Sequence, residues 1–175
     1  MVGTQAEQLM SYRAVEIANE FLRLPGAAES LTQMHLQKLT YIAHGWNWAV
    51  NNEPLIADDI EAWSFGPVVR DLYEHTKFFG SQPIGRLISP DDSQVARFFG
   101  KTGEAAPYRA DLSDREHQVI EQVWARYSGL NAIRLSELTH QPGTPWFQAF
   151  QRGRNSRIDD NAIRAHYNAL ADRAA

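Results

Sequence analysis

The chain contains no cysteine among its 175 residues. This absence excludes disulfides, a cysteine nucleophile, thiolate zinc sites and iron–sulfur clusters. Long hydrophobic runs are also missing, because the longest uninterrupted stretch of apolar side chains is three residues, whereas a membrane helix needs about 20. Residues 1–10 are polar and contain neither lysine nor arginine, so they do not read as an export signal. We therefore expect a cytoplasmic protein without a membrane segment.

An excess of basic residues is lacking as well. The chain has 17 basic and 21 acidic side chains, a formal net charge of −4, whereas nucleic-acid-binding domains usually carry a basic excess. Nucleic acid is therefore an unexpected partner. The composition, 43% hydrophobic and 22% charged, is that of a globular protein. We expect one domain over residues 11–175, preceded by a flexible tail at 1–10.

Helix signals dominate the sequence. Apolar residues recur at helical spacing, often with a capping residue before them and glycine or proline after them. The predicted fold is mainly α, a single compact domain of about six to eight helices, with room for a short strand pair near residues 55–64. Gly66-Pro67 opens a helix in this interpretation, because proline is favoured at a first helical position. The helices are expected at about 11–24, 32–51, 66–79, 90–99, 113–127, 132–139, 144–153 and 159–170.

The second of these helices is apolar on two faces. At 100° per residue, one sector holds Leu36, Leu39, Ile42, Ala43, Trp46 and Val50, and the opposite side holds Met34, Tyr41 and Trp48. Two apolar faces are typical of a helix at the centre of a bundle. The alternative is that the second stripe binds a partner, because aromatic side chains are enriched at interfaces.

No catalytic or metal-binding motif stands out. The sequence has no H-E-x-x-H, no phosphate-cradling glycine loop and no G-x-S-x-G elbow. His140 can satisfy buried backbone groups or act as an acid–base group, and Asp58, Asp59 and Glu61 can form a solvated edge or serve as acid and base. We expect no catalytic residue, no metal and no cofactor. A small hydrolase-like enzyme using these four residues remains the alternative.

One local basic patch is present. Arg152, Arg154 and Arg157 lie in a segment without acidic residues between two predicted helices. The patch is either a solvated connector or a grip for phosphate, nucleic acid or an acidic protein.

Three motifs occur in order over more than half of the chain. They are Leu36-Gln37-Lys38-Leu39 with Tyr41, Ala43, Gly45 and Trp46; Asp59 to Val69 with Leu72-Tyr73; and Leu138-Thr139-His140 with Pro145-Trp146. Together they resemble the Panacea antitoxin domain, and the resemblance extends over about residues 11–170. Thr40, Ile42 and His44 depart from the pattern, and residues 81–110 match nothing in it.

The resemblance implies a mostly helical protein that binds and neutralises a co-encoded toxin of a bacterial or phage toxin–antitoxin pair. The SocA-like branch implies a further role, as a proteolytic adaptor that presents the toxin to the protease ClpXP. Neither role requires catalysis. Residues 81–110 are a candidate source of toxin specificity.

The candidate toxin contacts combine the motif aromatics with the basic patch. Trp63 to Pro67 could equally form a buried corner. The candidates are Tyr41, Trp48, Trp63, Phe65, Gly66, Pro67, His140, Trp146, Arg152 and Arg154.

Overall fold

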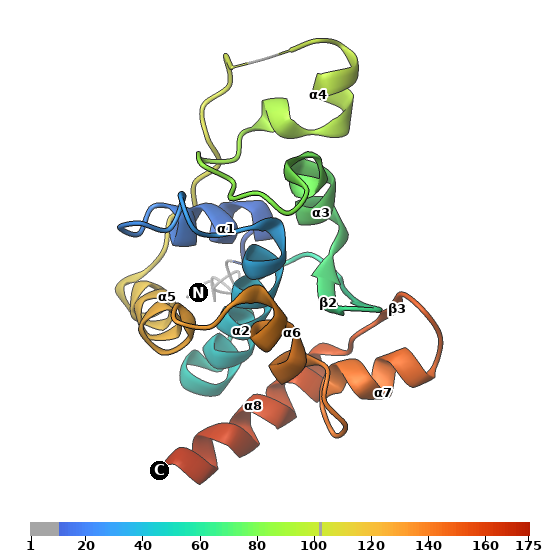
Figure 1. The fold of residues 1–175 in the computed structure, drawn as a ribbon. Helices are drawn as coiled ribbons and strands as arrows, with labels where there is room; N and C mark the ends of the chain where they lie inside the picture. The colour runs from blue at the N-terminus through green and yellow to red at the C-terminus, as the bar shows by residue number, and fades with distance from the viewer. Residues whose placement is uncertain (1–10, 102) are drawn as a thin grey trace, which may run out of the picture.

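A computed structural model describes residues 11–101 and 103–175, so the tail expected at 1–10 lies outside the described residues. Within them the chain forms eight α-helices, two single-turn 3₁₀ helices and a small sheet (Figure 1). This confirms the mainly helical prediction. The elements are α1 (Ala14–Leu22), α2 (Gln33–Asn51), β1 (Ile60–Trp63), β2 (Gly66–Val69), α3 (Arg70–Thr76), the 3₁₀ helices Lys77–Phe79 and Pro90–Asp92, α4 (Gln94–Phe98), α5 (Asp114–Tyr127), α6 (Ala132–Thr139), α7 (Pro145–Gln151), β3 (Ser156–Arg157) and α8 (Asp160–Ala174).

Helix α2 is the centre of the fold. It contacts α1, α3, α5, α6, α8 and strand β2, and it passes through the middle of the molecule in Figure 1. Leu36 on one of its faces is fully buried, and Tyr41 on the other is 2% exposed. The prediction of a central helix with two buried faces is therefore confirmed.

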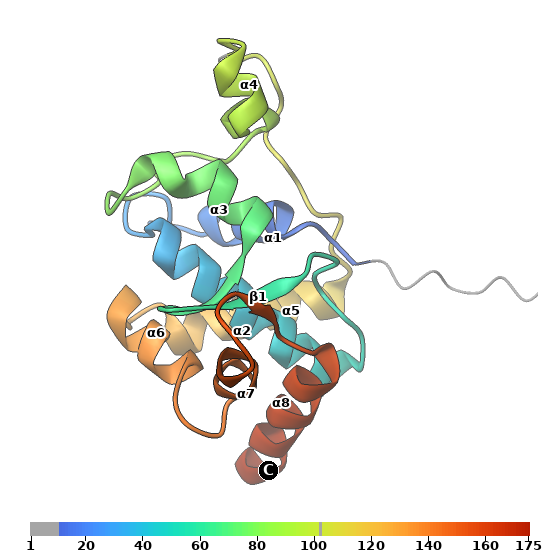
Figure 2. The same ribbon diagram turned by 90° about the vertical axis from the view of Figure 1, so that its right-hand side faces the viewer.

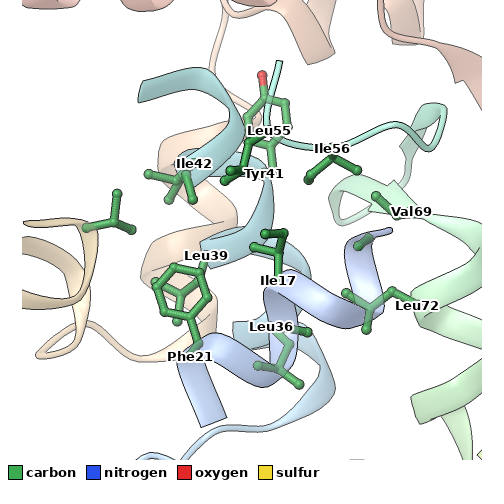
Figure 3. Packing of buried hydrophobic residues seen from close by; sticks show 14 of the residues in the cluster. Ile17, Phe21, Leu36, Leu39, Tyr41, Ile42, Leu55, Ile56, Val69 and Leu72 are labelled. Carbon is green, nitrogen blue, oxygen red and sulfur yellow. The ribbon is translucent and has the colours of Figure 1, made fainter. Parts of the chain in front are cut away.

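A single hydrophobic cluster surrounds this helix. Figure 3 shows Ile17 and Phe21 of α1 packed beside Leu36 and Leu39 of α2, and all four side chains are fully buried. Each buried aliphatic or aromatic side chain of this size contributes about 1.5–3 kcal/mol when it leaves water. Packing on α2 thus holds the helices in place.

Helices α2 and α8 approach closely at Gly45. A Cβ atom built at this position would lie 2.2 Å from Cε2 of the Tyr167 ring, so no other residue fits without displacing α8. Glycine in a helix interior costs up to about 1 kcal/mol relative to alanine. The close packing of the two helices explains why a glycine stands there.

The sheet has the strand order β2-β1-β3, and both pairs are antiparallel. Strands β1 and β2 form a hairpin in which Ile60 pairs with Val69 and Trp63 with Gly66, so that Ser64 and Phe65 form the turn. The expectation that Gly66-Pro67 opens a helix is wrong, since helix α3 begins at Arg70. Gly66 has a φ of 111°, which is not helical, and Pro67 lies on an edge strand, where a missing N–H is tolerated.

The first helix also begins differently from the prediction. The helix is expected from about residue 11, whereas its N-cap in the structure is Arg13. The backbone N–H of Ala14 donates to the carboxylate of Asp58 at 2.6 Å. A side chain distant in the sequence thus serves the helix start, which local capping rules cannot anticipate.

The segment that carries α4 stands apart from the other helices (Figure 2). Val95, Phe98 and Phe99 are 67–83% exposed there. The buried carboxylate of Asp92 pairs with Arg86 and Arg97 at the base of the segment. Within the described part of the chain, no helix is long and apolar enough to cross a lipid bilayer.

Removal of the hydroxyl group should have opposite effects on stability at two buried tyrosines. The Tyr41 hydroxyl has no hydrogen-bond partner among the described residues, and a buried unsatisfied polar group costs about 1–3 kcal/mol. We expect Tyr41→Phe to raise the free energy of unfolding by about 1 kcal/mol, measured by urea denaturation.

The Tyr12 hydroxyl lies 2.7 Å from the carbonyl oxygen of Asp111 and 3.0 Å from the carboxylate of Glu116. The matched Tyr12→Phe variant should therefore be less stable than the wild type, and equal losses in both variants would contradict the argument.

Candidate functional site

The β1–β2 hairpin is held to helix α2 by two consecutive side chains. The side-chain amide of Gln37 donates to the carbonyl oxygen of Val69 at 3.0 Å and accepts from its N–H at 2.8 Å. The ammonium of Lys38 donates to the carbonyl oxygen of Pro67 at 3.0 Å. Gln37 and Lys38 thus supply bonds that a further strand would otherwise make with β2.

The C-terminal helices hold the other part of the hairpin. The indole N–H of Trp146 in α7 donates to the carbonyl oxygen of Trp63 at 2.7 Å. The hydroxyl of Ser136 in α6 donates to the carbonyl oxygen of Phe65. The first and third sequence motifs therefore both bond to the backbone of this hairpin, which belongs to the second motif.

Gly66 allows this close assembly. A Cβ atom at Gly66 would lie 2.8 Å from Cε of Lys38 and 3.1 Å from the hydroxyl of Thr139. Its positive φ of 111° also disfavours other residues. Gly66 therefore serves packing and backbone geometry beneath the hairpin and offers no side chain to a partner.

Lys38 is the functional candidate that the sequence interpretation missed. Its side chain is 1% exposed, and burial lowers the pKa of its ammonium from 10.5 to about 7. A signal was available, because Lys38 lies four residues after Met34 and three before Tyr41, which places a charge within the second apolar stripe of the helix. A lysine on a buried helical face needs a specific explanation.

The structure brings six of the ten candidate contacts together around the hairpin. Phe65 is 71% exposed at its tip. Gly66, Pro67 and Trp146 are buried, and Trp63 and His140 are half-buried. The His140 ring lies 5.2 Å from that of Trp146, and its Nδ1 lies 3.2 Å from the Ser136 hydroxyl.

Arg152 and Arg154 lie beside the same hairpin. They belong to the loop between α7 and β3, and β3 pairs with β1. Both side chains are exposed. Arg152 donates to the carbonyl oxygen of Arg157, and Arg157 pairs with Asp59 at 3.0 Å. The third arginine of the basic patch is therefore engaged within the protein.

Tyr41 and Trp48 lie elsewhere, against α8. The Tyr41 ring packs on that of Tyr167 at 6.1 Å, and its burial leaves no area for a partner. Trp48 is half-buried and stacks with Arg164, whose guanidinium lies 5.4 Å from the ring. The structure does not bring these two residues to the hairpin.

The carboxylates of the alternative enzyme site each have their own structural partner. Burial raises the pKa of Asp58, which accepts from Ala14, and Asp59 pairs with Arg157. Glu61 accepts from Arg70 and from the indole of Trp63. In the described residues, no hydrogen bond or ion pair joins His140 to these carboxylates, and no cluster of three metal-ligating side chains occurs.

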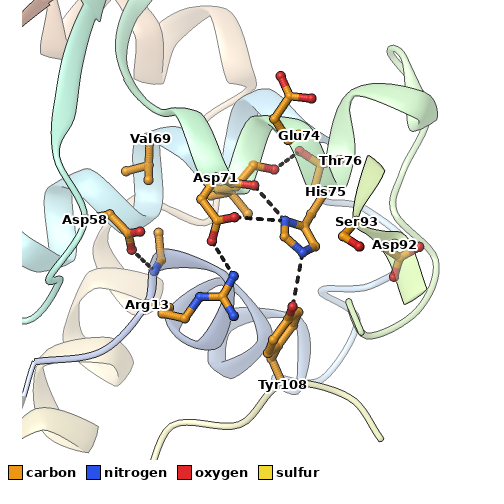
Figure 4. Close-up of polar contacts among 12 residues, drawn as sticks. Arg13, Asp58, Val69, Asp71, Glu74, His75, Thr76, Asp92, Ser93 and Tyr108 are labelled. Atoms are coloured by element: carbon orange, nitrogen blue, oxygen red, sulfur yellow. Dashed lines mark hydrogen bonds and ion pairs between the residues drawn. The ribbon is translucent and has the colours of Figure 1, made fainter. Parts of the chain in front are cut away.

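A second polar network lies next to Asp58 and connects elements of the fold (Figure 4). Asp71 pairs with Arg13 at 2.7 Å and lies 3.4 Å from the buried His75. His75 Nε2 lies 3.1 Å from the hydroxyl of Tyr108. The network ties α1 and α3 to the segment that precedes α5, and it satisfies the buried imidazole within the fold.

His44 has an equally local purpose. Its Nδ1 accepts from the backbone N–H groups of Leu55 and Ile56 at 3.2 and 3.1 Å. Its Nε2 lies 3.2 Å from Asp160, and this hydrogen bond lowers the pKa of the Asp160 carboxyl. A buried histidine of the kind considered for His140 thus occurs at His44.

A pocket of about 560 Å³ adjoins the hairpin. It lies between the first turns of α2, the hairpin and the first residue of α6, Ala132. Trp63, Phe65 and Lys38 line it, together with Asn155 from the arginine-containing loop. The exposed candidate contacts and the buried lysine therefore belong to one region.

Comparisons with known proteins agree with the sequence motifs. A family model described as "Antitoxin SocA-like, Panacea domain" matches residues 36–147. The chain is 31% identical over 145 residues to Antitoxin SocA of Caulobacter vibrioides (strain NA1000 / CB15N), which covers 82% of this chain and 72% of the relative. No solved structure matches significantly.

The burial of Lys38 predicts a specific pH dependence of stability. The unfolded lysine keeps its proton up to a pKa of about 10.5, whereas the folded one releases it from about pH 7. The unfolded state therefore binds more protons between these values, and stability should rise with pH by about 5 kcal/mol across this window. Lys38→Met removes this effect, and we expect the variant to be at least as stable as the wild type at pH 7.

The measurement is the difference in unfolding free energy between wild type and Lys38→Met at pH 7, 8, 9 and 10. The wild type should gain relative to the variant at each step. Lys101→Met, which changes an exposed lysine, is the matched control and should show no such trend. A pH-independent difference for Lys38→Met would contradict the assignment.

Proposed function

The chain belongs to the family of SocA-like antitoxins with a Panacea domain, and we propose that it binds and neutralises a toxin protein encoded beside it. The observation that carries this proposal is the family match together with a curated antitoxin that shares 31% identity over most of the chain. Membership of an antitoxin family favours a binding role over catalysis. Asp58, Asp59 and Glu61 each bind a different group of the fold, and this also favours a binding role over catalysis.

The hairpin region is the proposed toxin-binding surface. Phe65 is exposed at its turn, and Trp63 at the end of β1 is half-buried. The neighbouring loop exposes Arg152 and Arg154. Tryptophan and arginine are enriched among the residues that dominate binding energy. The hairpin is also held rigidly by side chains of α2, α6 and α7, which reduces the entropy lost on binding. Neutralisation then follows from occlusion of the toxin's working surface.

A second step would use the same complex. We propose that the bound toxin is presented to the protease ClpXP in the cytoplasm, as the SocA-like resemblance implies. In that case the toxin's half-life should be shorter when the chain and the protease are both present than when either is missing. An unchanged half-life alongside preserved neutralisation would leave occlusion as the mechanism.

The test of the function is co-expression with the neighbouring gene. The tagged chain should restore growth to cells that express the neighbour's product, and the two proteins should co-purify or the toxin should disappear. A neighbour that is harmless when expressed alone, with no bound protein, would contradict the antitoxin proposal.

Phe65→Ala separates binding from folding. The side chain is 71% exposed, so its truncation should change the unfolding free energy by less than about 0.5 kcal/mol. If Phe65 anchors the toxin, binding should weaken by about 30-fold, as for a residue that contributes about 2 kcal/mol. Val50→Ala, at a 62% exposed position near the end of α2, is the control and should bind like the wild type. Full neutralisation by Phe65→Ala would remove the hairpin tip from the interface.

A further inference from the structure

The pocket beside the hairpin has an apolar wall. Its apolar and aromatic lining residues include Met34 of α2, Trp63 and Phe65 of the hairpin, Val68 of β2 and Tyr73 of α3. Its volume of about 560 Å³ falls within the range of about 300–1,000 Å³ that is usual for small-ligand sites. Such sites combine an apolar lining with a few placed polar groups.

Lys38 supplies a cation to this lining. Its ammonium carries three N–H donors, and the described residues offer it one acceptor, the carbonyl oxygen of Pro67. No ion pair is formed with a carboxylate in the described part of the chain. A Cβ atom built at Gly66 would lie 3.2 Å from Nζ, so the end of the Lys38 side chain lies against the Gly66 backbone. Lys38 lines the pocket, and two of its three donors have no partner among the described residues.

The other charged and titratable groups nearby are already engaged. Glu61 on β1 pairs with Arg70, and His140, the residue that follows α6, lies within hydrogen-bond distance of Ser136. Tyr73 is the other titratable side chain in the lining. No carboxylate of the described residues pairs with Lys38, so an anion that pairs with its charged form would come from a ligand.

The lining also defines the rest of the ligand. A single ammonium, with no arginine in the lining, can balance one negative charge, whereas a phosphate dianion would leave a charge buried without a partner. The aromatic rings favour an apolar or aromatic body. We propose that the pocket binds a monocarboxylate with an apolar or aromatic body, and that Lys38 pairs with its carboxylate.

The direct test uses the full chain and 3-phenylpropanoate as the probe, with 3-phenylpropanamide as the uncharged match. We expect the carboxylate to bind at least tenfold more tightly than the amide in a calorimetric titration, because charge-assisted hydrogen bonds are the stronger ones. Lys38→Met should abolish this preference while retaining the fold.

A pH series adds a readout specific to the lysine. The probe stays ionised between pH 6 and pH 8, whereas the ammonium has a pKa of about 7 in the free protein. Affinity for the carboxylate should therefore fall about tenfold over this range, and affinity for the amide should not change. Equal affinity for the two probes, or a preference that survives in Lys38→Met, would overturn the proposal.

A second arm identifies the source of the carboxylate, and this arm rests on the proposed antitoxin function. If the toxin supplies the group, Lys38→Met should weaken the toxin complex and 3-phenylpropanoate should compete with the toxin. If a free acid is the ligand, the probe should bind to the free chain with its Lys38-dependent preference, and Lys38→Met should neutralise normally. Failure of the probe arm with intact neutralisation would reject the pocket proposal and leave the antitoxin function standing.

Discussion

The fold depends on how the backbone of one edge strand is satisfied. Strand β2 has a neighbour on one side alone within the described sheet, so its outer carbonyl and N–H groups require other partners. Gln37 and Lys38 provide them from the central helix. This arrangement fixes the register between α2 and the hairpin, and α6 and α7 then close on the hairpin turn through Ser136 and Trp146.

The same constraint explains why the family motifs are poor guides to contact surface. Most motif residues bond the hairpin backbone or fill the core, as Trp146 and Gly66 do. Phe65 differs from these residues, because its carbonyl oxygen is bound while its ring is 71% exposed. Exposed aromatics also occur on the projecting α4 segment, at Phe98 and Phe99, and this segment falls in the stretch that matches no family motif. A shared fold and variable recognition can therefore coexist, with the hairpin providing the rigid part.

Local signals predicted the elements that local interactions determine. The helix expected at about 113–127 does begin there, because Ser113 and Glu116 form a capping box at the start of α5. The two apolar faces of α2 correctly indicate a central helix. The predicted helix start at Gly66-Pro67 is wrong, because the conformation of these two residues depends on pairing with β1 and on the close approach of Lys38. The assembly of Trp63 with Trp146 was equally hidden, since the two residues lie 83 positions apart. Spacing along one helix cannot report such contacts.

The contribution of Lys38 to stability does not explain why a lysine occupies this buried position. A methionine could fill the same buried space without the cost of burying an ammonium, and its loss of one hydrogen bond to Pro67 would cost about 1 kcal/mol. A buried charge is weak evidence for stability, and apolar replacements are often neutral or stabilising. The hydrogen bond to the hairpin therefore does not account for the lysine by itself. A role in which the charge meets an anion at the pocket does account for it, because the partner would then offset the cost of burial.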